Sequence, residues 1–257
     1  MSTSSDVTRS DVPEPPFIQL LDAIDAMPGA AELRAHTYDL LRLLPGQSVA
    51  DVGCGTGRAV AELADRGARP IGVDIDAQML AVARRRWPSR DFATGGAEQL
   101  PIPAGSVAGY RADKVLHLVD DPIRALAEAQ RVLASRGRIV LTGQDWDGIM
   151  IDSVDPGLTR TIVHARADTI AHPRAARQSH VWLLDAGFRD VTTDVLTAVL
   201  TDTRMLPLVT GLADAACDAG AVTRDRADVW TAEHTRRAQT GRLFVAVPIF
   251  VTAATRP

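Results

Sequence analysis

Two periods of apolar residues run along the chain and predict its secondary structure. Stripes at every third or fourth position indicate helices, and short apolar runs bounded by glycine, proline and polar residues indicate buried strands. Phe17, Leu20, Leu21 and Ile24 form the first helical stripe. The apolar runs predict seven strands, at 49–52, 69–74, 91–95, 107–112, 138–142, 191–200 and 243–253. Helical stripes lie between them, at 58–66, 76–86, 123–134, 156–171, 175–186 and 206–238.

The alternation of strands and helices predicts the fold class. Repeats of this kind build a doubly wound α/β domain, in which helices cover both faces of a mostly parallel sheet. The segment before the sheet, 17–44, is predicted to be helical with a break near Pro28-Gly29. This segment could lie across a ligand as a lid or simply cover the edge of the sheet, and the pattern leaves both open.

A glycine-rich turn follows the first strand and is the strongest chemical signal in the chain. Gly53, Gly55 and Gly57 stand at alternate positions, so the backbone can turn sharply and approach a ligand without a Cβ in the way. The N–H groups at the start of the next helix would face that ligand. Asp74 ends the second strand at the same edge of the sheet, where a carboxylate can accept hydrogen bonds from a ribose.

Two classes of nucleotide cofactor use such a turn, and Asp74 suits both. The dinucleotide fingerprint needs G-x-G-x-x-G, and Arg58 occupies the position of its third glycine. A nicotinamide-dependent dehydrogenase is therefore disfavoured. The D-x-G-x-G-x-G spacing from Asp51 to Gly57 instead resembles motif I of the class I S-adenosylmethionine-dependent methyltransferases.

Further segments extend this resemblance to the small-molecule branch of ubiquinone and menaquinone biosynthesis. Gly-Gly-Ala-Glu-Gln-Leu-Pro at 95–101 resembles that branch's Gly-Asp-Ala-Glu-x-Leu-Pro, and Arg-Val-Leu at 131–133 matches as well. The resemblance is strong over 40–142 and weaker over 179–252. It implies a Rossmann-like methyltransferase sheet of seven strands with an antiparallel last strand, and it implies S-adenosyl-L-methionine as the cofactor.

The resemblance also assigns cofactor-binding roles. Ile75 and Met79 would pack against the adenine, although a core methionine is the alternative for Met79. The backbone of Ala97 would donate to an adenine ring nitrogen. Gly96 replaces an aspartate that accepts from the adenine amino group in that branch, so Glu98, a water or another group would take over. The predicted cofactor-binding residues are Asp51, Gly53, Cys54, Gly55, Gly57, Asp74, Ile75, Met79, Gly96, Ala97, Glu98 and Ala112.

Two residues are the candidates for catalysis. Methyl transfer needs chiefly alignment, because the sulfonium leaving group is already activated. A hydroxyl acceptor would benefit from a general base, and His117 follows the fourth strand, where the Leu116-His117 pair matches the family's turn under the methyl group. Asp145, after the fifth strand, would orient the imidazole or bind the acceptor. A turn histidine and a capping carboxylate are the alternatives for these two residues.

The predicted function is therefore methyl transfer to a small molecule, at a hydroxyl of a secondary metabolite. A protein of the same fold that binds the cofactor without transferring methyl, as a cyclase or structurally, stays open as the alternative. The histidines and carboxylates show no metal-binding spacing, so no metal is expected.

Composition limits the partners and the location. The 257 residues are 46% hydrophobic and 23% charged, which suits one domain. A formal charge of −4 gives no reason to expect nucleic acid. The two cysteines, the absence of a long apolar run and the absence of a signal pattern favour a cytoplasmic protein without membrane contact. We expect a monomer or a homodimer.

The predicted organisation of the chain has four parts. Residues 1–16 are rich in Ser, Asp and Pro and are expected to form a disordered tail. The remaining 17–257 form a single domain, with an N-terminal helical lid at 17–44 and a cofactor-binding core at 45–143. Helical segments at 144–180 and 203–240 are expected on the substrate side.

Overall fold

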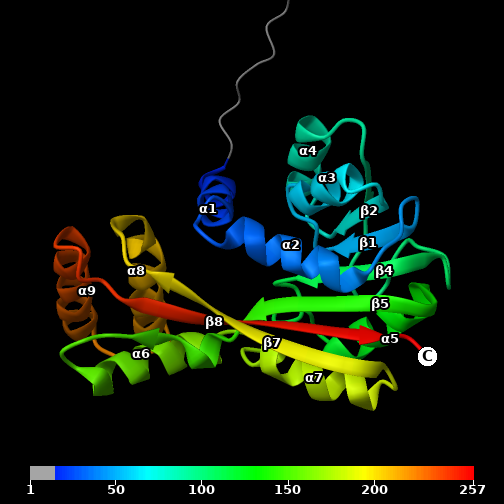
Figure 1. The fold of residues 1–257 in the computed structure, drawn as a ribbon. Helices are drawn as coiled ribbons and strands as arrows, with labels where there is room; N and C mark the ends of the chain where they lie inside the picture. The colour runs from blue at the N-terminus through cyan, green and yellow to red at the C-terminus, as the bar shows by residue number, and fades with distance from the viewer. Residues whose placement is uncertain (1–14) are drawn as a thin grey trace, which may run out of the picture.

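A single sheet forms the centre of the protein, and a computed structural model describes it for residues 15–257. The sheet has eight strands in the order β3-β2-β1-β4-β5-β8-β6, and β7 pairs with β8 (Figure 1). The predicted doubly wound, mostly parallel α/β fold is confirmed. The sheet gains a strand over the predicted seven because the two-residue β6 (Met150–Ile151) pairs with β8.

The first five strands run parallel to one another. They are β1 (Ser48–Val52), β2 (Arg69–Asp74), β3 (Asp91–Thr94), β4 (Val107–Asp113) and β5 (Leu133–Gln144). The connecting helices are α3 (Arg58–Asp65), α4 (Ala77–Arg86) and α5 (Pro122–Val132). Because the strands are parallel, their carboxyl ends meet at one edge, and this edge carries the glycine-rich turn and the residues after β4 and β5.

The last long strands close the sheet. β8 (Val245–Thr255) runs antiparallel to β5 and to β7 (Arg189–Leu200), which confirms the predicted antiparallel last strand. The β5 pairing ends at Gln144 opposite Ile249, whereas β7 and β8 stay paired as far as Leu200 and Val245. β7 and β8 therefore continue beyond β5 as an arm, whose far end also pairs with the short β6 (Figure 1).

Three helices gather at the end of this arm and are called here the helical unit. They are α6 (Pro156–Asp168), α8 (Leu206–Asp218) and α9 (Arg224–Gln239). The predicted helical segment at 206–238 contains two helices, α8 and α9, separated by a turn at Gly220, whose φ is +71°. The short 3-10 helices η1 (Trp146–Gly148) and η2 (Thr203–Met205) adjoin the unit, and α7 (Ala175–Asp185) packs against the sheet.

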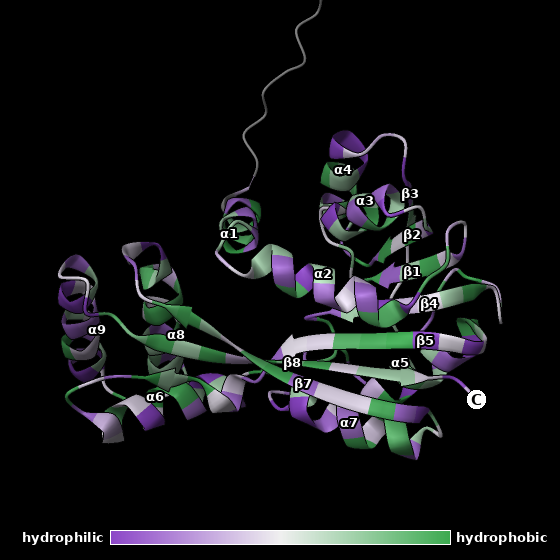
Figure 2. Cartoon of the chain, in the orientation of Figure 1, coloured by the Kyte–Doolittle hydropathy of each residue, from purple (hydrophilic) through white to green (hydrophobic). Residues whose placement is uncertain are grey.

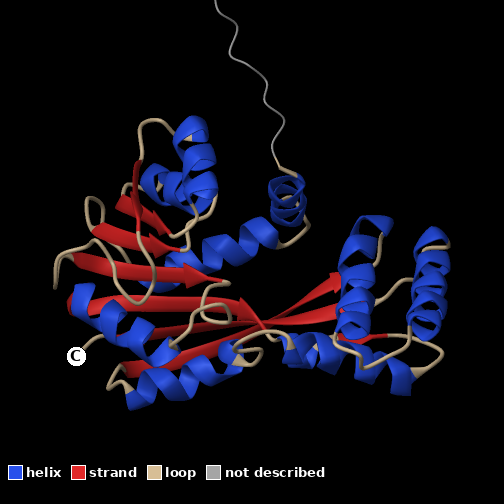
Figure 3. Cartoon of the chain, turned by 180° about the vertical axis from the view of Figure 1, so that it is seen from behind, coloured by secondary structure: helices blue, strands red, loops and turns tan. Residues whose placement is uncertain are grey.

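The sheet and the helical unit have separate apolar cores. The core of the sheet contains the fully buried Leu126 and Ile139, and the core of the helical unit contains the fully buried Trp230 and Leu212. Figure 2 shows β5 as hydrophobic over much of its length. The view from behind shows the helical unit at the far end of the arm (Figure 3), so the carboxyl edge of the sheet faces this unit.

The N-terminal segment forms two helices over the sheet. α1 (Pro16–Asp25) and α2 (Ala30–Leu41) are separated at the predicted break, where Gly29 has a φ of +83°. Tyr38 of α2 packs against the sheet, and Ile18 of α1 packs against α4. Most of the predicted tail at 1–16 lies outside the described residues. Among residues 15–257, no helix combines the length and the apolar character needed to cross a membrane.

Candidate active site

The glycine-rich turn leaves one glycine facing open space. All three glycines have positive φ, at +68° for Gly53, +53° for Gly55 and +82° for Gly57. A Cβ on Gly53 would collide with Val115, and a Cβ on Gly57 would lie 2.7 Å from Phe92. A Cβ on Gly55 would meet no atom within 4 Å. Gly53 and Gly57 are therefore required by packing, whereas Gly55 leaves room for a ligand.

The amides of the turn itself are mostly occupied within the protein. Gly53 and Cys54 donate to the carbonyl of Val73, and Gly57 donates to that of Cys54. Gly55 N donates to Asp74 Oδ2 at 2.7 Å. The Cys54 side chain is 8% exposed and packs in the core, where burial raises the pKa of its thiol. The turn thus offers a ligand space rather than a row of donors.

Asp74 contacts the turn at Gly55, and Ile75, the next residue in the chain, lies beside Gly96. Besides the bond from Gly55, Asp74 accepts from Asp76 N at 2.9 Å through Oδ1. Ile75 is 78% exposed, and a Cβ on Gly96 would meet only the Ile75 side chain, at 3.9 Å. An exposed isoleucine facing an open glycine forms an apolar surface of the kind that stacks against a nucleobase.

The side chains of four other predicted cofactor residues pack or form hydrogen bonds within the protein. Met79 is buried against Ile18 and Val82, which agrees with the core alternative. Glu98 Oε1 accepts from Asp121 N at 2.8 Å and so holds the start of α5. Ala97 and Ala112 are buried in the core of the sheet, and only their backbones can contribute to a site.

Arg111 was missed by the sequence analysis and organises a buried ionic group. It donates to Asp51 and to Asp113, each at 2.8 Å, and to Thr37 of α2 at 3.0 Å. Asp51 therefore binds a neighbouring strand rather than pointing freely into the site. Burial alone would raise the pKa of Asp113, but Lys114 and Arg111 hold it below its ordinary value. The signal that could have revealed Arg111 is a charge inside a strand predicted to be buried.

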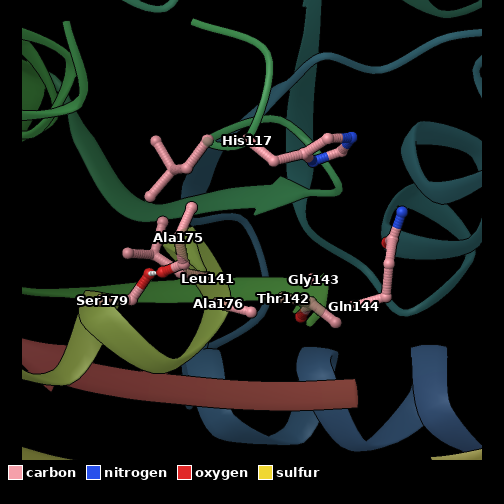
Figure 4. Close-up of a pocket in the computed structure, with 9 residues that line it drawn as sticks. His117, Leu141, Thr142, Gly143, Gln144, Ala175, Ala176 and Ser179 are labelled. Atoms are coloured by element: carbon pink, nitrogen blue, oxygen red, sulfur yellow. Dashed lines mark hydrogen bonds between the residues drawn. The ribbon is translucent and has the colours of Figure 1, made fainter. Parts of the chain in front are cut away.

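His117 lies where predicted, at the carboxyl edge after β4. Lys114 has a φ of +60°, and its N–H donates to the carbonyl of Thr142 at 2.7 Å, which turns the chain at the end of the strand. His117 then lines a cavity of about 10 Å³, enough for about one water. The other residues around the cavity (Figure 4) are Leu116, Leu141, Thr142, Gly143, Gln144, Ala175, Ala176 and Ser179.

The imidazole of His117 is a weaker base than the sequence suggested. Its residue is 8% exposed, and burial, with the charges of Lys114 and Arg166, lowers its pKa from 6.5 to about 4. This pKa lies well below the near-neutral value of an unperturbed histidine. At neutral pH the ring is uncharged and can accept a proton, and its low basicity is the cost of its burial.

Asp145 was predicted to orient the His117 imidazole or to bind the acceptor, but its carboxylate is bound elsewhere. Its side chain is fully buried, and both of its oxygens bind the guanidinium of Arg177 on α7, with Nη2 to Oδ1 at 2.7 Å. Oδ1 also accepts from the backbone N of Asp147 at 3.1 Å and caps η1. Asp145 thus links the end of β5 to α7. It is the capping carboxylate of the alternative interpretation, and it also forms an ion pair with Arg177.

Three polar atoms near His117 are buried without a hydrogen-bond partner among residues 15–257. They are Thr142 Oγ1, Gln144 Oε1 and Trp146 Nε1. Buried polar groups are nearly always paired, so these atoms are expected to bind a ligand or water. The Trp146 ring centre lies 5.9 Å from that of His117. These residues were not singled out in the sequence, although they alternate at the end of a predicted strand on the ligand edge.

Known proteins identify the class to which this fold and site belong. Residues 50–141 match the family model described as a methyltransferase domain. An uncharacterized 37.1 kDa protein in transposon TN4556 of Streptomyces fradiae is 33% identical over 98% of this chain and 74% of its own length. Demethylmenaquinone methyltransferase of Renibacterium salmoninarum is 37% identical, but over only 42% of this chain and 46% of its own length.

A solved structure shows the same fold. Phosphoethanolamine N-methyltransferase 2 of Haemonchus contortus, in complex with phosphomonomethylethanolamine and S-adenosylhomocysteine, superposes with a TM-score of 0.62. It is 16% identical, and the match covers 93% of this chain and 57% of that one.

The parallel sheet, the open glycine turn and Asp74 define a Rossmann-like methyltransferase. The chain belongs to the class I S-adenosylmethionine-dependent methyltransferases, and it is of the ubiquinone/menaquinone-like type. S-adenosyl-L-methionine is its cofactor, and the residues present fit it, because a Cβ on Gly55 would project into open space at a turn that also carries the Asp74 carboxylate. A protein of this fold that binds the cofactor without transferring methyl is not favoured.

Proposed function

We propose that this enzyme methylates a hydroxyl of a small-molecule acceptor, such as a secondary metabolite, with His117 as the proton acceptor. The observation that carries the proposal is the uncharged imidazole of His117, buried at the carboxyl end of β4 beside an internal cavity. A neutral imidazole can take the proton that a hydroxyl loses when its oxygen is methylated. An amine acceptor is the other class that such a site could serve.

The proposed roles divide the site into two parts. S-adenosylmethionine supplies an electrophilic methyl group when it is bound. On the cofactor side, Asp74 would accept from the ribose hydroxyls, and Ile75 with Gly96 would contact the adenine. On the acceptor side, Thr142 and Gln144 would orient the acceptor with their unpartnered oxygens, and His117 would hold the released proton.

The proposed organisation follows the same division. α1 and α2 (17–44) would act as a lid, 45–143 as the cofactor-binding core, and the helical segments at 144–180 and 203–240 would enclose the acceptor. In support, the unpartnered atoms lie at the junction of β5 and η1, which faces the helical unit. The proposed partner is a small molecule, and neither a membrane nor nucleic acid is proposed as a partner. A cytoplasmic location and a monomeric or homodimeric state remain predictions.

Methyl transfer to a panel of hydroxylated compounds tests the proposal, with S-adenosylhomocysteine release as the measurement. His117→Asn should lower kcat on the order of 10²–10⁴-fold and leave the Kd for S-adenosylmethionine nearly unchanged. His36→Asn, at a histidine of α2 that bonds Asp194 of β7 and does not line the cavity, is the matched control. The wild-type kcat should stay level from about pH 6 to pH 8 and fall as pH drops toward the His117 pKa of about 4, because only the neutral ring is a base.

Two results would contradict the proposal in different ways. If kcat fell less than about threefold in His117→Asn, far short of general-base catalysis, alignment alone would suffice and His117 would have a structural role. If S-adenosylmethionine bound tightly but only amines were methylated, the acceptor class would be wrong.

A further inference from the structure

One cation near His117 has no acidic partner among residues 15–257. Arg166 of α6 lies with its Cζ 5.0 Å from the centre of the Trp146 ring, and its Nη1 donates to Thr169 Oγ1 at 2.6 Å. No carboxylate in the described part of the chain forms an ion pair with it. By contrast, Arg177 and Arg237, near the same elements, each bind carboxylates.

The surroundings of Arg166 provide further donors. The Trp146 ring is close to both Arg166 and His117, and its buried Nε1 has no acceptor among residues 15–257. The Thr142 hydroxyl, in a residue 6% exposed, is also unpartnered. A guanidinium that stacks on an indole keeps its N–H edge available for a planar oxyanion. An indole N–H can only donate, so it too fits an acceptor atom.

Several other charged side chains in this region are paired within the protein. Lys114 Nζ lies 3.0 Å from Asp113. Asp145 and Asp147 are both bound by Arg177, and Asp147 also lies 4.0 Å from His164. Three charged groups act on the His117 ring: Lys114, Asp113 and Arg166. Lys114 and Asp113 pair with each other, whereas Arg166 forms no ion pair within residues 15–257.

We propose that the acceptor carries an anionic group, a carboxylate or a phosphate, which Arg166 and the Trp146 N–H bind beside His117. This inference rests on the proposed function and names the chemical class of acceptor for the same site. The anion would anchor one end of the acceptor against α6 and η1, so that its hydroxyl reaches His117. The alternative role for Arg166 is structural, as a stacking partner of Trp146 and a cation in the last turn of α6.

Anion binding tests the proposal directly. The full chain, saturated with S-adenosylhomocysteine, would be titrated with inorganic phosphate and separately with 4-hydroxybenzoate at constant ionic strength, with tryptophan fluorescence as the readout. 4-Hydroxybenzyl alcohol is the neutral probe. We expect saturable binding of at least one anion, and Arg166→Met should weaken it about 10–100-fold, the range for a hydrogen-bonded charge. The anion that binds identifies the carboxylate or the phosphate as the source.

Two further variants keep the result interpretable. Arg160→Met, at an exposed arginine on the same helix, should bind the anion like the wild type. Arg166→Lys retains the charge but not the planar fork, and its affinity should fall between those of wild type and Arg166→Met. It also serves if Arg166→Met does not fold. A structural role for Arg166 would lower stability without a selective loss of anion binding.

The outcomes separate this inference from the proposed function. It is overturned if neither anion binds saturably, or if the anion binds equally well to wild type and Arg166→Met. If neutral hydroxyl compounds are methylated with the same KM by both proteins, the anionic class is wrong while methyl transfer stands. If anions bind through Arg166 but no hydroxyl compound yields S-adenosylhomocysteine, the proposed function fails and the anion site stands.

Discussion

Single residues in the glycine-rich turn have different tasks, although the sequence pattern treats them alike. A side chain at Gly53 or Gly57 would collide with Val115 or Phe92. Gly55 has free space around its missing Cβ and donates its N–H to Asp74. Substitutions at Gly53 and Gly57 should therefore damage the fold, whereas a substitution at Gly55 should damage cofactor binding.

Gly55→Ala should lower the affinity for S-adenosylmethionine at least tenfold, because the new methyl group would project into the open space at the turn. The matched control is Gly105→Ala, which has a similar φ of +63° and also no atom within 4 Å, but lies in the loop before β4 at the other edge of the sheet. Each change should cost about 1–2 kcal/mol of stability from the left-handed backbone. Calorimetric titration of the two folded variants is the measurement, and equal affinities would remove Gly55 from the site.

Asp74→Asn should weaken S-adenosylmethionine binding by tens to a hundredfold, or about 2–3 kcal/mol. The carboxylate accepts from Gly55 N and Asp76 N, and in the proposed role it would also accept from the ribose. Asp91→Asn, at an exposed aspartate that begins β3, is the control. An unchanged Kd for Asp74→Asn would show that the ribose binds elsewhere.

Among the elements, those specified by local patterns were predictable from the sequence. β2 was predicted to the residue, and the break between α1 and α2 followed from Pro28-Gly29. The start of β5 could not be predicted from a local pattern. Leu133 pairs with Val107 beside a register shift, and polar residues follow Leu133 in the chain. Such long-range pairing leaves no periodic signal. β6 is too short to have one.

The candidate site shows the same limit. Its cofactor side, from Gly53 to Asp74, consists of residues close in the chain and could be predicted. The Asp145–Arg177 contact joins residues 32 positions apart on different elements, so the sequence could not show that Asp145 is already bound. The burial that lowers the pKa of His117 likewise depends on packing after β4 and β5 have been assembled.

α1 is attached to the cofactor side by ion pairs, which suits a lid. Asp22 binds Arg86 at 2.6 Å, and Asp25 binds Arg58 at 3.0 Å. Arg86 also donates to Thr56 of the turn at 3.3 Å. These contacts place α1 beside the glycine-rich turn, where its opening would release the cofactor.

Asp22→Asn should therefore speed the dissociation of S-adenosylhomocysteine severalfold while changing Tm little, since partly exposed ion pairs contribute about 0–1 kcal/mol. Asp39→Asn on α2 removes an exposed pair with Arg66, which follows α3, and should leave the dissociation rate unchanged. Stopped-flow displacement measures both rates. Equal rates in the wild type and Asp22→Asn would favour the alternative in which α1 only covers the sheet.

At the scale of the whole molecule, two apolar cores meet at a polar junction. The sheet and the helical unit are joined by the β7–β8 arm, and the carboxyl edge of the sheet faces that unit (Figures 1 and 3). His117, Thr142 and Trp146 lie at this junction. The packing of α7 and η1 around the ends of β4 and β5 thus buries polar groups that the unfolded chain leaves in water.

This burial predicts a dependence of global stability on pH. The His117 pKa is about 4 in the folded protein and about 6.5 in the unfolded chain. Between these values the unfolded chain binds more protons, so acidification favours unfolding. The stability is fully present above about pH 6.5 and is lost as pH falls toward 4, by at most about 3 kcal/mol.

Urea denaturation of the wild type and His117→Gln at pH 7.5 and at pH 4.5 measures this effect. The wild type should lose about 2–3 kcal/mol more than the variant over this interval, because the variant lacks the imidazole while both share every other titrating group. Equal m-values in the two proteins would show that the same surface is exposed on unfolding. Parallel losses of stability in both proteins would mean that His117 can be protonated in the folded state at little cost, and the junction would then be more hydrated than its burial indicates.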